Sequence, residues 1–201
     1  MVSFKFILSL GLLGSTITSA FPTLGRTPGC GEIDIFMTGL PASHPLVKAQ
    51  GFDPIFVNKS LTADAAEVVK AGYNLRGKNP NPRTFSDSQS LRSPNAGIFH
   101  LVVLMGPEQP ISILGDQLNG INWDGTGVGF GVRGSPLQNL TVRLEDILQT
   151  YREKAWRAPI LFNHSPTSSL WAIQRHFPLS SNCTNSPGKD LGLSIICDIC
   201  D

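Results

Sequence analysis

Two groups of residues with acid–base or nucleophilic chemistry stand where predicted strands end. Glu108 follows one strand, and His164 and Ser165 follow another. A histidine beside a serine, with a carboxylate in reach, can activate the hydroxyl as a nucleophile. These three candidate catalytic residues support the hypothesis of a hydrolase or transferase. No G-x-S-x-G sequence surrounds a serine, so the motif typical of α/β-hydrolases is missing.

The same strand ends also carry groups suited to binding. The guanidinium of Arg133 can hold a carboxylate or phosphate with two hydrogen bonds, and glycine turns let backbone N–H groups face an anion. Ligands of open α/β sheets bind beyond the carboxyl ends of the strands. The sequence therefore predicts a small anionic or polar ligand at one shared rim. The alternative is a set of ordinary turns, with Arg133 paired to Glu145 or Asp146. The predicted ligand-binding residues are Gly39, Gly106, Gly131, Arg133 and Asn163.

A glycine at every second position distinguishes the stretch from Gly125 to Gly131. Period two is the strand period, so a strand here has one face without side chains. Such a face usually marks the close approach of another backbone or a ligand. We predict a strand over residues 121–132. The stretch 129–134 matches G-x-G-x-x-G, but no helix opens at its last glycine, so no dinucleotide or other cofactor is expected.

The chain has four cysteines, Cys30, Cys183, Cys197 and Cys200. An even number in an oxidising compartment favours two disulfides, with three possible connectivities. Our preferred pairing joins Cys30 and Cys183 to the terminal pair. The Cys197-Asp-Ile-Cys200 spacing is also compatible with a redox pair or half a zinc site. No metal is expected, because His44 and His100 have no plausible ligand partners in the sequence.

The first residues predict secretion. Lys5 precedes an apolar run at 6–14, and small residues follow up to Ala20, as in a signal peptide over 1–20. The alternative, a membrane anchor, needs about 20 apolar residues. The expected location is extracellular, with no membrane contact after cleavage. Sequons at Asn58, Asn139 and Asn182 predict glycosylation, whereas Asn163 is disfavoured because Pro166 follows its sequon.

Composition restricts the partners further. The net charge is +1 and 15% of residues are charged, without a basic block, so no nucleic-acid partner is expected. The remaining expected partner is an unknown small molecule. The sequence leaves the oligomeric state open.

Helical and strand patterns alternate along the chain. Strands are predicted at 33–37, 73–76 continuing at 101–105, 121–132 and 159–162, and helices at 61–72, 111–118, 142–155 and 168–176. This alternation predicts a three-layer α/β, Rossmann-like (flavodoxin-like) domain. We expect a short, mainly parallel sheet of about four strands in the order 2-1-3-4. The domain spans 32–178 after an extended lead-in at 21–31, and 179–201 form a tail with three cysteines.

Residues 77–101 interrupt this pattern with a polar, aperiodic stretch that is long for a compact domain. At codon level, GGT for Gly77 followed by a lysine codon reads as a splice donor, and a leucine codon ending in TA before Val102 reads as an acceptor. Removing 77–101 restores a valine codon in frame and joins 73–76 to the strand at 102–105. We therefore hypothesise a retained intron, and the alternative is a genuine loop.

Five short stretches in a fixed order carry a resemblance. They lie at 33–41, 71–76, 123–124 with 129–133, 144–147 and 158–163, within a region from 33 to about 177. With 77–101 set aside, the chain resembles an uncharacterised family of small Rossmann-like proteins found in bacteria and as secreted fungal proteins. The resemblance implies the fold and no reaction.

Overall fold

The computed structural model describes residues 27–75, 100–190 and 192–200. The predicted signal peptide and nearly all of 77–101 lie outside these residues. Six strands are formed: β1 Asp34–Gly39, β2 Asn74–Leu75, β3 His100–Met105, β4 Gly125–Val128, β5 Ile160–Phe162 and β6 Gly192–Ile196. The helices are α1 Pro45–Ala49, α2 Pro54–Lys70, α3 Ile111–Leu118, α4 Phe130–Arg133, α5 Gln138–Lys154 and α6 Ser169–Gln174.

The strands form one parallel sheet in the order β5-β4-β1-β3-β6, with β2 also paired to β1. The predicted Rossmann-like α/β fold is confirmed. The predicted strand count and order are inexact for two reasons. The second predicted strand is present as two segments, β2 and β3, and β6 adds a strand beside β3. Residues 179–201 are therefore not simply a tail, because β6 belongs to the sheet.

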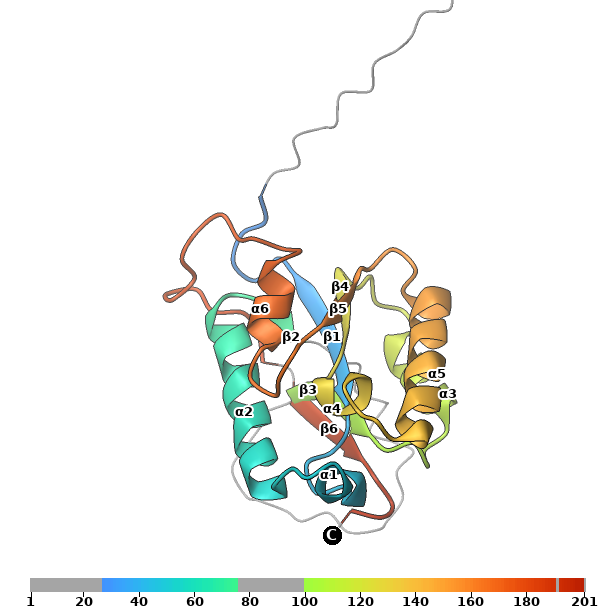
Figure 1. Cartoon of the computed structure of the whole chain (residues 1–201). Helices are drawn as coiled ribbons and strands as arrows, with labels where there is room; N and C mark the ends of the chain where they lie inside the picture. Colours follow the sequence, from blue (N-terminus) through green and yellow to red (C-terminus); the bar gives the residue numbers. More distant parts are fainter. Residues whose placement is uncertain (1–26, 76–99, 191, 201) are drawn as a thin grey trace, which may run out of the picture.

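Helices cover the sheet on both faces, with α2 and α6 on one side and α3 and α5 on the other (Figure 1). The alternation of side chains along β1 explains this layering. Ile35 and Met37 pack in one apolar cluster with Val68 of α2 and Ile173 of α6. Phe36 points to the opposite side, where Tyr151 of α5 contacts its ring edge-on at 6.1 Å between centroids.

The glycine stretch is shorter as a strand than predicted. Only Gly125–Val128 is extended, and the chain turns at Gly129 into the single-turn helix α4. Neighbouring side chains fill the glycine face, because a Cβ at Gly125 would meet Ile35, Phe177 and Leu161, and one at Gly127 would meet Met37. The glycines thus permit close packing of the sheet against its own core.

Three helix boundaries also differ from the prediction. α2 begins at Pro54, seven residues earlier than expected, where the Asp53 side chain accepts a hydrogen bond from Ile55 N. α5 begins at Gln138, so Asn139 lies inside the helix and does not cap it. Ser168 precedes α6 at its N-terminal end.

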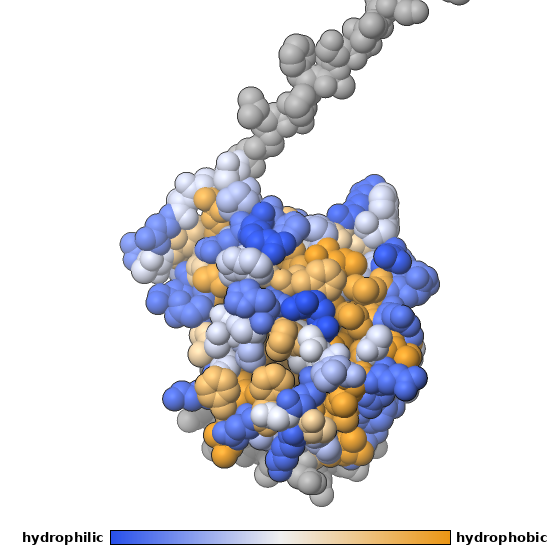
Figure 2. Space-filling model, in the orientation of Figure 1, coloured by the Kyte–Doolittle hydropathy of each residue, from blue (hydrophilic) through white to orange (hydrophobic). Residues whose placement is uncertain are grey.

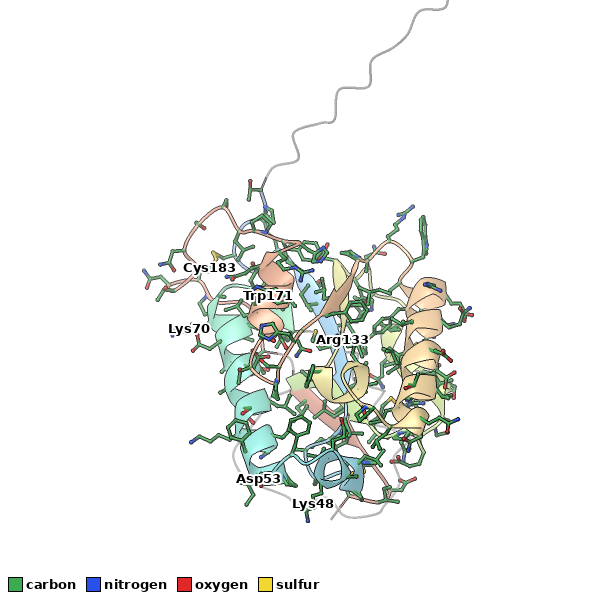
Figure 3. The ribbon with its side chains drawn as sticks, in the orientation of Figure 1. Lys48, Asp53, Lys70, Arg133, Trp171 and Cys183 are labelled. Carbon is green, nitrogen blue, oxygen red and sulfur yellow. A yellow bond between two sulfur atoms is a disulfide. The ribbon has the colours of Figure 1, made fainter. Side chains whose placement is uncertain are left out.

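All four cysteines are in disulfides, but the pairing differs from the preferred one. Cys30 bonds to Cys183 across 153 residues, and Cys197 bonds to Cys200. Cys183 lies at the end of the molecule opposite α1, whereas Cys197, after β6, lies beside His44 at the start of α1 (Figures 1 and 3). The long-range bond therefore ties the lead-in to the segment after α6, and the short one closes a local loop after β6.

The two segments β2 and β3 occupy one position in the sheet. Asn74 and Leu75 of β2 pair with Asp34 and Ile35, and Val102, Val103 and Leu104 of β3 pair with Met37, Thr38 and Gly39. On the other side, Leu75 bridges to Asp190 and Val103 pairs with Ser194 of β6. β1 thus runs past the junction, and β2 and β3 are collinear along it. A single position of β1, Phe36, separates their partners.

Candidate functional site

A cavity of about 280 Å³ opens at the carboxyl ends of β1 and β4, beneath the inner face of α2. Three of the predicted ligand-binding residues line it: Gly39 from the end of β1, Gly131 in α4 and Asn163 after β5. The sheet order places these strand ends side by side, so this part of the predicted rim is assembled. Figure 2 shows that apolar residues also reach the surface near β5 and α4.

Apolar side chains dominate the lining of this cavity. They come from the sheet, from α2 and from the segment after α1, and include Met37, Leu40, Phe52, Val57, Leu61 and Val68. Close approach of backbones shapes its floor, because Gly129 N–H donates to Thr38 O at 2.8 Å and a Cβ at Gly129 would lie 3.3 Å from the same oxygen. Such a lining favours an apolar ligand over a highly charged one.

Three buried polar side chains, Thr38, Asp64 and Asn163, interrupt the apolar lining, and Thr38 Oγ1 donates to Val103 O. Asn163 is 2% exposed and donates from Nδ2 to Ser165 O and Ser169 Oγ, whereas its Oδ1 has no hydrogen-bond partner among the described residues. Asp64 of α2 accepts from Ser169 N with both carboxylate oxygens, which anchors the start of α6. Burial raises the pKa of Asp64, against the opposing hydrogen bonds from Ser169 and Leu170.

Arg133 does not stand at a strand end as predicted. It is the last residue of α4, and Figure 3 shows it near the centre of this face. Its Nη2 donates to Asn163 O at 3.0 Å, and its guanidinium lies 5.5 Å from the centre of the Phe130 ring. Among the described residues it makes no ion pair, so the alternative pairing with Glu145 or Asp146 is not observed. Arg133 therefore supports the Asn163 backbone beside the cavity and does not line it.

The remaining rim residues, Gly106 and Glu108, belong to a second cluster after β3. Glu108 Oε2 lies 3.0 Å from Nε2 of His44, which is 1% exposed and stands at the N-terminal end of α1. A Cβ at Gly106 would overlap both side chains, so the pair requires glycine there. His44 was expected to have no partner, and the structure corrects this expectation. Its position before Pro45 was the only local signal, because Pro is common at the first helical position.

Hydrogen bonds define the tautomer of His44. Leu46 N donates to Nδ1 at 3.1 Å, so Nδ1 is an unprotonated acceptor in the neutral ring. Nε2 therefore carries the proton and donates it to Glu108. Burial acts to raise the pKa of Glu108, but hydrogen bonds from His44 and the backbone outweigh it, and the pKa lies below its ordinary value of 4.5.

This lowered pKa makes a testable contribution to stability. A depressed carboxyl pKa stabilises the fold above the ordinary value, and the contribution is lost as pH falls through the folded value. We expect Glu108→Gln to lower the free energy of unfolding at pH 7, and the difference from wild type to vanish as pH falls below 4.5. Urea unfolding across this range measures it. A difference that stayed constant with pH would contradict the assigned charge on Glu108.

Cys197 adjoins the His44–Glu108 pair. One ligand atom of each of the three residues lies within 4.8 Å of the others. The geometry does not fit a resident metal in this state, because the Cys197 sulfur is in a disulfide and the proton on His44 Nε2 occupies the position that would face an ion. Metal-bound histidines instead donate from their other ring nitrogen.

Arg143 of α5 supports the loop that carries Glu108. It is 3% exposed and donates from Nη1 to Gln109 O at 2.9 Å. Burial lowers its pKa, whereas the charges of Asp146 and Glu108 raise it. No sequence signal marked this residue, because it lies in an otherwise ordinary helix.

The structure does not assemble the three predicted catalytic residues. The imidazole of His164 packs against the Trp171 ring at 4.9 Å between centroids, and Ser165 Oγ lies near Thr167 Oγ1. Glu108 is bound to His44, and no hydrogen bond between described side chains joins it to His164 or Ser165. Asp124 has a structural role, because its Oδ2 accepts from Asp34 N at 2.7 Å.

Comparison of the chain with family models, curated protein sequences and solved structures found no match. The resemblance described from the sequence therefore stays a prediction, and the function is argued from the geometry alone.

Proposed function

We propose that this protein binds a small, mostly apolar molecule carrying one hydrogen-bond donor in the cavity beneath α2. The observation that carries the proposal is the cavity of about 280 Å³, which is lined by apolar side chains and assembled from the ends of β1, β4 and β5. Ligands of open α/β sheets bind at this edge. The volume suits a compact ligand, since it lies at the lower end for small-molecule sites.

Two polar groups define the chemistry of the ligand. The unpartnered Oδ1 of Asn163 favours a donor such as a hydroxyl, because a buried acceptor without a partner is costly. Asp64 disfavours an anion in the same cavity when its carboxylate is charged. Arg133, the predicted anion contact, is engaged with Asn163 O and Phe130. The ligand is therefore better described as apolar with a donor than as anionic.

Two probes whose alkyl chains have the same length, one an alcohol and one a carboxylate, test the predicted chemistry of the ligand. We expect 1-octanol to raise the thermal midpoint as its concentration increases, and octanoate at equal concentration to have little effect. Ala65→Leu, in the cavity lining, should weaken octanol binding by about tenfold, or ~1.4 kcal/mol, measured by calorimetry.

Ala63→Leu is the matched control, because Ala63 lies exposed on α2 outside the cavity lining. It should bind octanol as the wild type does. Equal loss in both variants, or tighter binding of octanoate than of octanol, would overturn the proposal.

We also propose that the mature protein is extracellular and glycosylated. Two disulfides are compatible with an oxidising compartment. In the described part of the chain, no helix has the length and apolar character needed to cross a membrane. Asn58, Asn139 and Asn182 are exposed, as acceptor sites must be, whereas Asn163 is buried. Mass spectrometry of the secreted protein before and after glycosidase treatment tests this.

A further inference from the structure

The ionisable side chains that line the cavity beneath α2 are all acidic. Asp64 lies buried on α2, and Asp190 lies exposed shortly before β6. No lysine, arginine or histidine of the described residues lines this cavity. Its apolar walls screen these charges poorly, because charges interact more strongly in a medium of low dielectric constant. The charge of the lining therefore favours a cation over an anion.

Asp64 is a buried carboxylate that no described cation neutralises. It is 6% exposed, and it accepts from Ser169 N with Oδ1 at 3.2 Å and with Oδ2 at 3.1 Å. Burial raises its pKa, and only hydrogen bonds from Ser169 and Leu170 oppose this effect, without a contribution from a positively charged side chain. A carboxylate can accept about four hydrogen bonds, so Asp64 can accept further donors from a ligand.

Asn163 supplies a second acceptor in the same lining. Its Nδ2 donates to Ser165 O at 2.9 Å and to Ser169 Oγ at 3.3 Å. A carbonyl oxygen can only accept, so the bond to Ser165 O fixes the orientation of the amide. The Oδ1 atom is then the one that has no partner among the described residues. Because Asp64 and Asn163 both bond to Ser169, their free acceptor positions lie in one part of the cavity.

We infer that the ligand is a primary amine, which binds as an alkylammonium ion and donates N–H bonds to the Asp64 carboxylate and to Asn163 Oδ1. The inference rests on the proposed function, of which it names the ligand class. A hydroxyl has one donor and can meet only one of these acceptors, whereas an ammonium group has three donors and a positive charge. A calcium ion would need about six or more oxygen ligands, which this apolar lining does not offer.

The head group is tested by calorimetry of the full chain with octylammonium, octyltrimethylammonium and 1-octanol at pH 7. Charge-assisted hydrogen bonds are roughly twice as strong as neutral ones, so we expect octylammonium to bind about tenfold more tightly than 1-octanol. Octyltrimethylammonium keeps the charge but has no N–H group, so it should bind more weakly than octylammonium.

The outcomes separate the inference from the proposed function. If 1-octanol bound as tightly as octylammonium or more tightly, the amine would be wrong while the apolar cavity site remained. Equal affinities of the two ammonium ions would overturn the N–H bonds to Asp64 and Asn163. If none of the probes bound, the inference and the proposed function would both fail.

Asp64→Asn tests the counter-ion directly. It keeps the size of the side chain and an oxygen that can accept from Ser169 N, and it removes the charge. We expect D64N to bind octylammonium about tenfold more weakly and 1-octanol as the wild type does. Asp116→Asn is the matched control, because Asp116 lies exposed on α3, outside the cavity lining. It should bind both probes normally.

Unchanged octylammonium binding in D64N, or an equal loss of both probes, would remove Asp64 as the counter-ion. The comparison of probes on the wild type decides the ligand class even if D64N does not fold.

Discussion

Deletion of residues 77–101 is expected to leave a folded domain that is more stable than the full chain. The register of the sheet supports this. Ile35 pairs with Leu75 and Met37 pairs with Val102, so one residue of β1 separates the two partners. The deletion leaves one residue, Arg76, between Leu75 and Val102, and the two segments then form one uninterrupted strand. Closing a loop of 25 residues costs about 3 kcal/mol in chain entropy, and urea unfolding should show a gain of that order.

Neighbouring deletions provide a sharp control. Removing 77–100 leaves one residue too many, and removing 77–102 leaves one too few. A shift of one residue turns every side chain to the other face of a strand, so both variants should be less stable than the 77–101 deletion. Equal stability of all three deletions would contradict the register argument.

The same measurements bear on the intron hypothesis without deciding it. A stable deleted form shows that the domain does not need residues 77–101. The hypothesis itself is tested on natural material, because a tryptic peptide covering Phe85 in abundant mature protein would show that the segment is translated and retained.

Loss of the long-range disulfide is expected to have the largest effect on stability. Cys30→Ser with Cys183→Ser removes a cross-link over 153 residues, which the chain-entropy relation values at about 5 kcal/mol. Cys183 also packs against Gly72, where a positive φ of 100° favours glycine, so serine at 183 also changes this contact. Urea unfolding under oxidising conditions measures the loss.

The second pair of cysteines provides the comparison. Cys197→Ser with Cys200→Ser opens a loop between residues three apart, for which the same relation gives about 2 kcal/mol. If this double variant lost as much stability as Cys30→Ser with Cys183→Ser, loop length would not explain the contribution of the long-range bond.

Strong local patterns were sufficient for much of the fold. The helix at 111–118 has the predicted bounds, and the predicted core strands form a parallel sheet. The glycine stretch was correctly assigned to a strand, but its end was misplaced. Strand and single-turn helix are both compatible with alternating glycines, and the contact between Gly129 and Thr38 decides where the chain turns.

Only part of each candidate site could be predicted from the sequence. The ends of β1, β4 and β5 could be named as binding positions because parallel strands end at one edge. The apolar character of the cavity could not be predicted, because it depends on the inner face of α2, which lies over that edge of the sheet only in the folded protein. Arg133 was expected to face a ligand because it follows the predicted strand. In the structure its side chain instead donates a hydrogen bond to Asn163 O.

The sequence by itself determined the alternation of helices and strands, the presence of four cysteines and the interruption at 77–101. These features depend only on the local periodicity and the composition of the sequence. The tertiary structure decided the disulfide pairing, the place of β6 and the meeting of His44, Glu108 and Cys197. These depend on contacts between residues far apart in the chain, whose separation in space is set only when the sheet assembles.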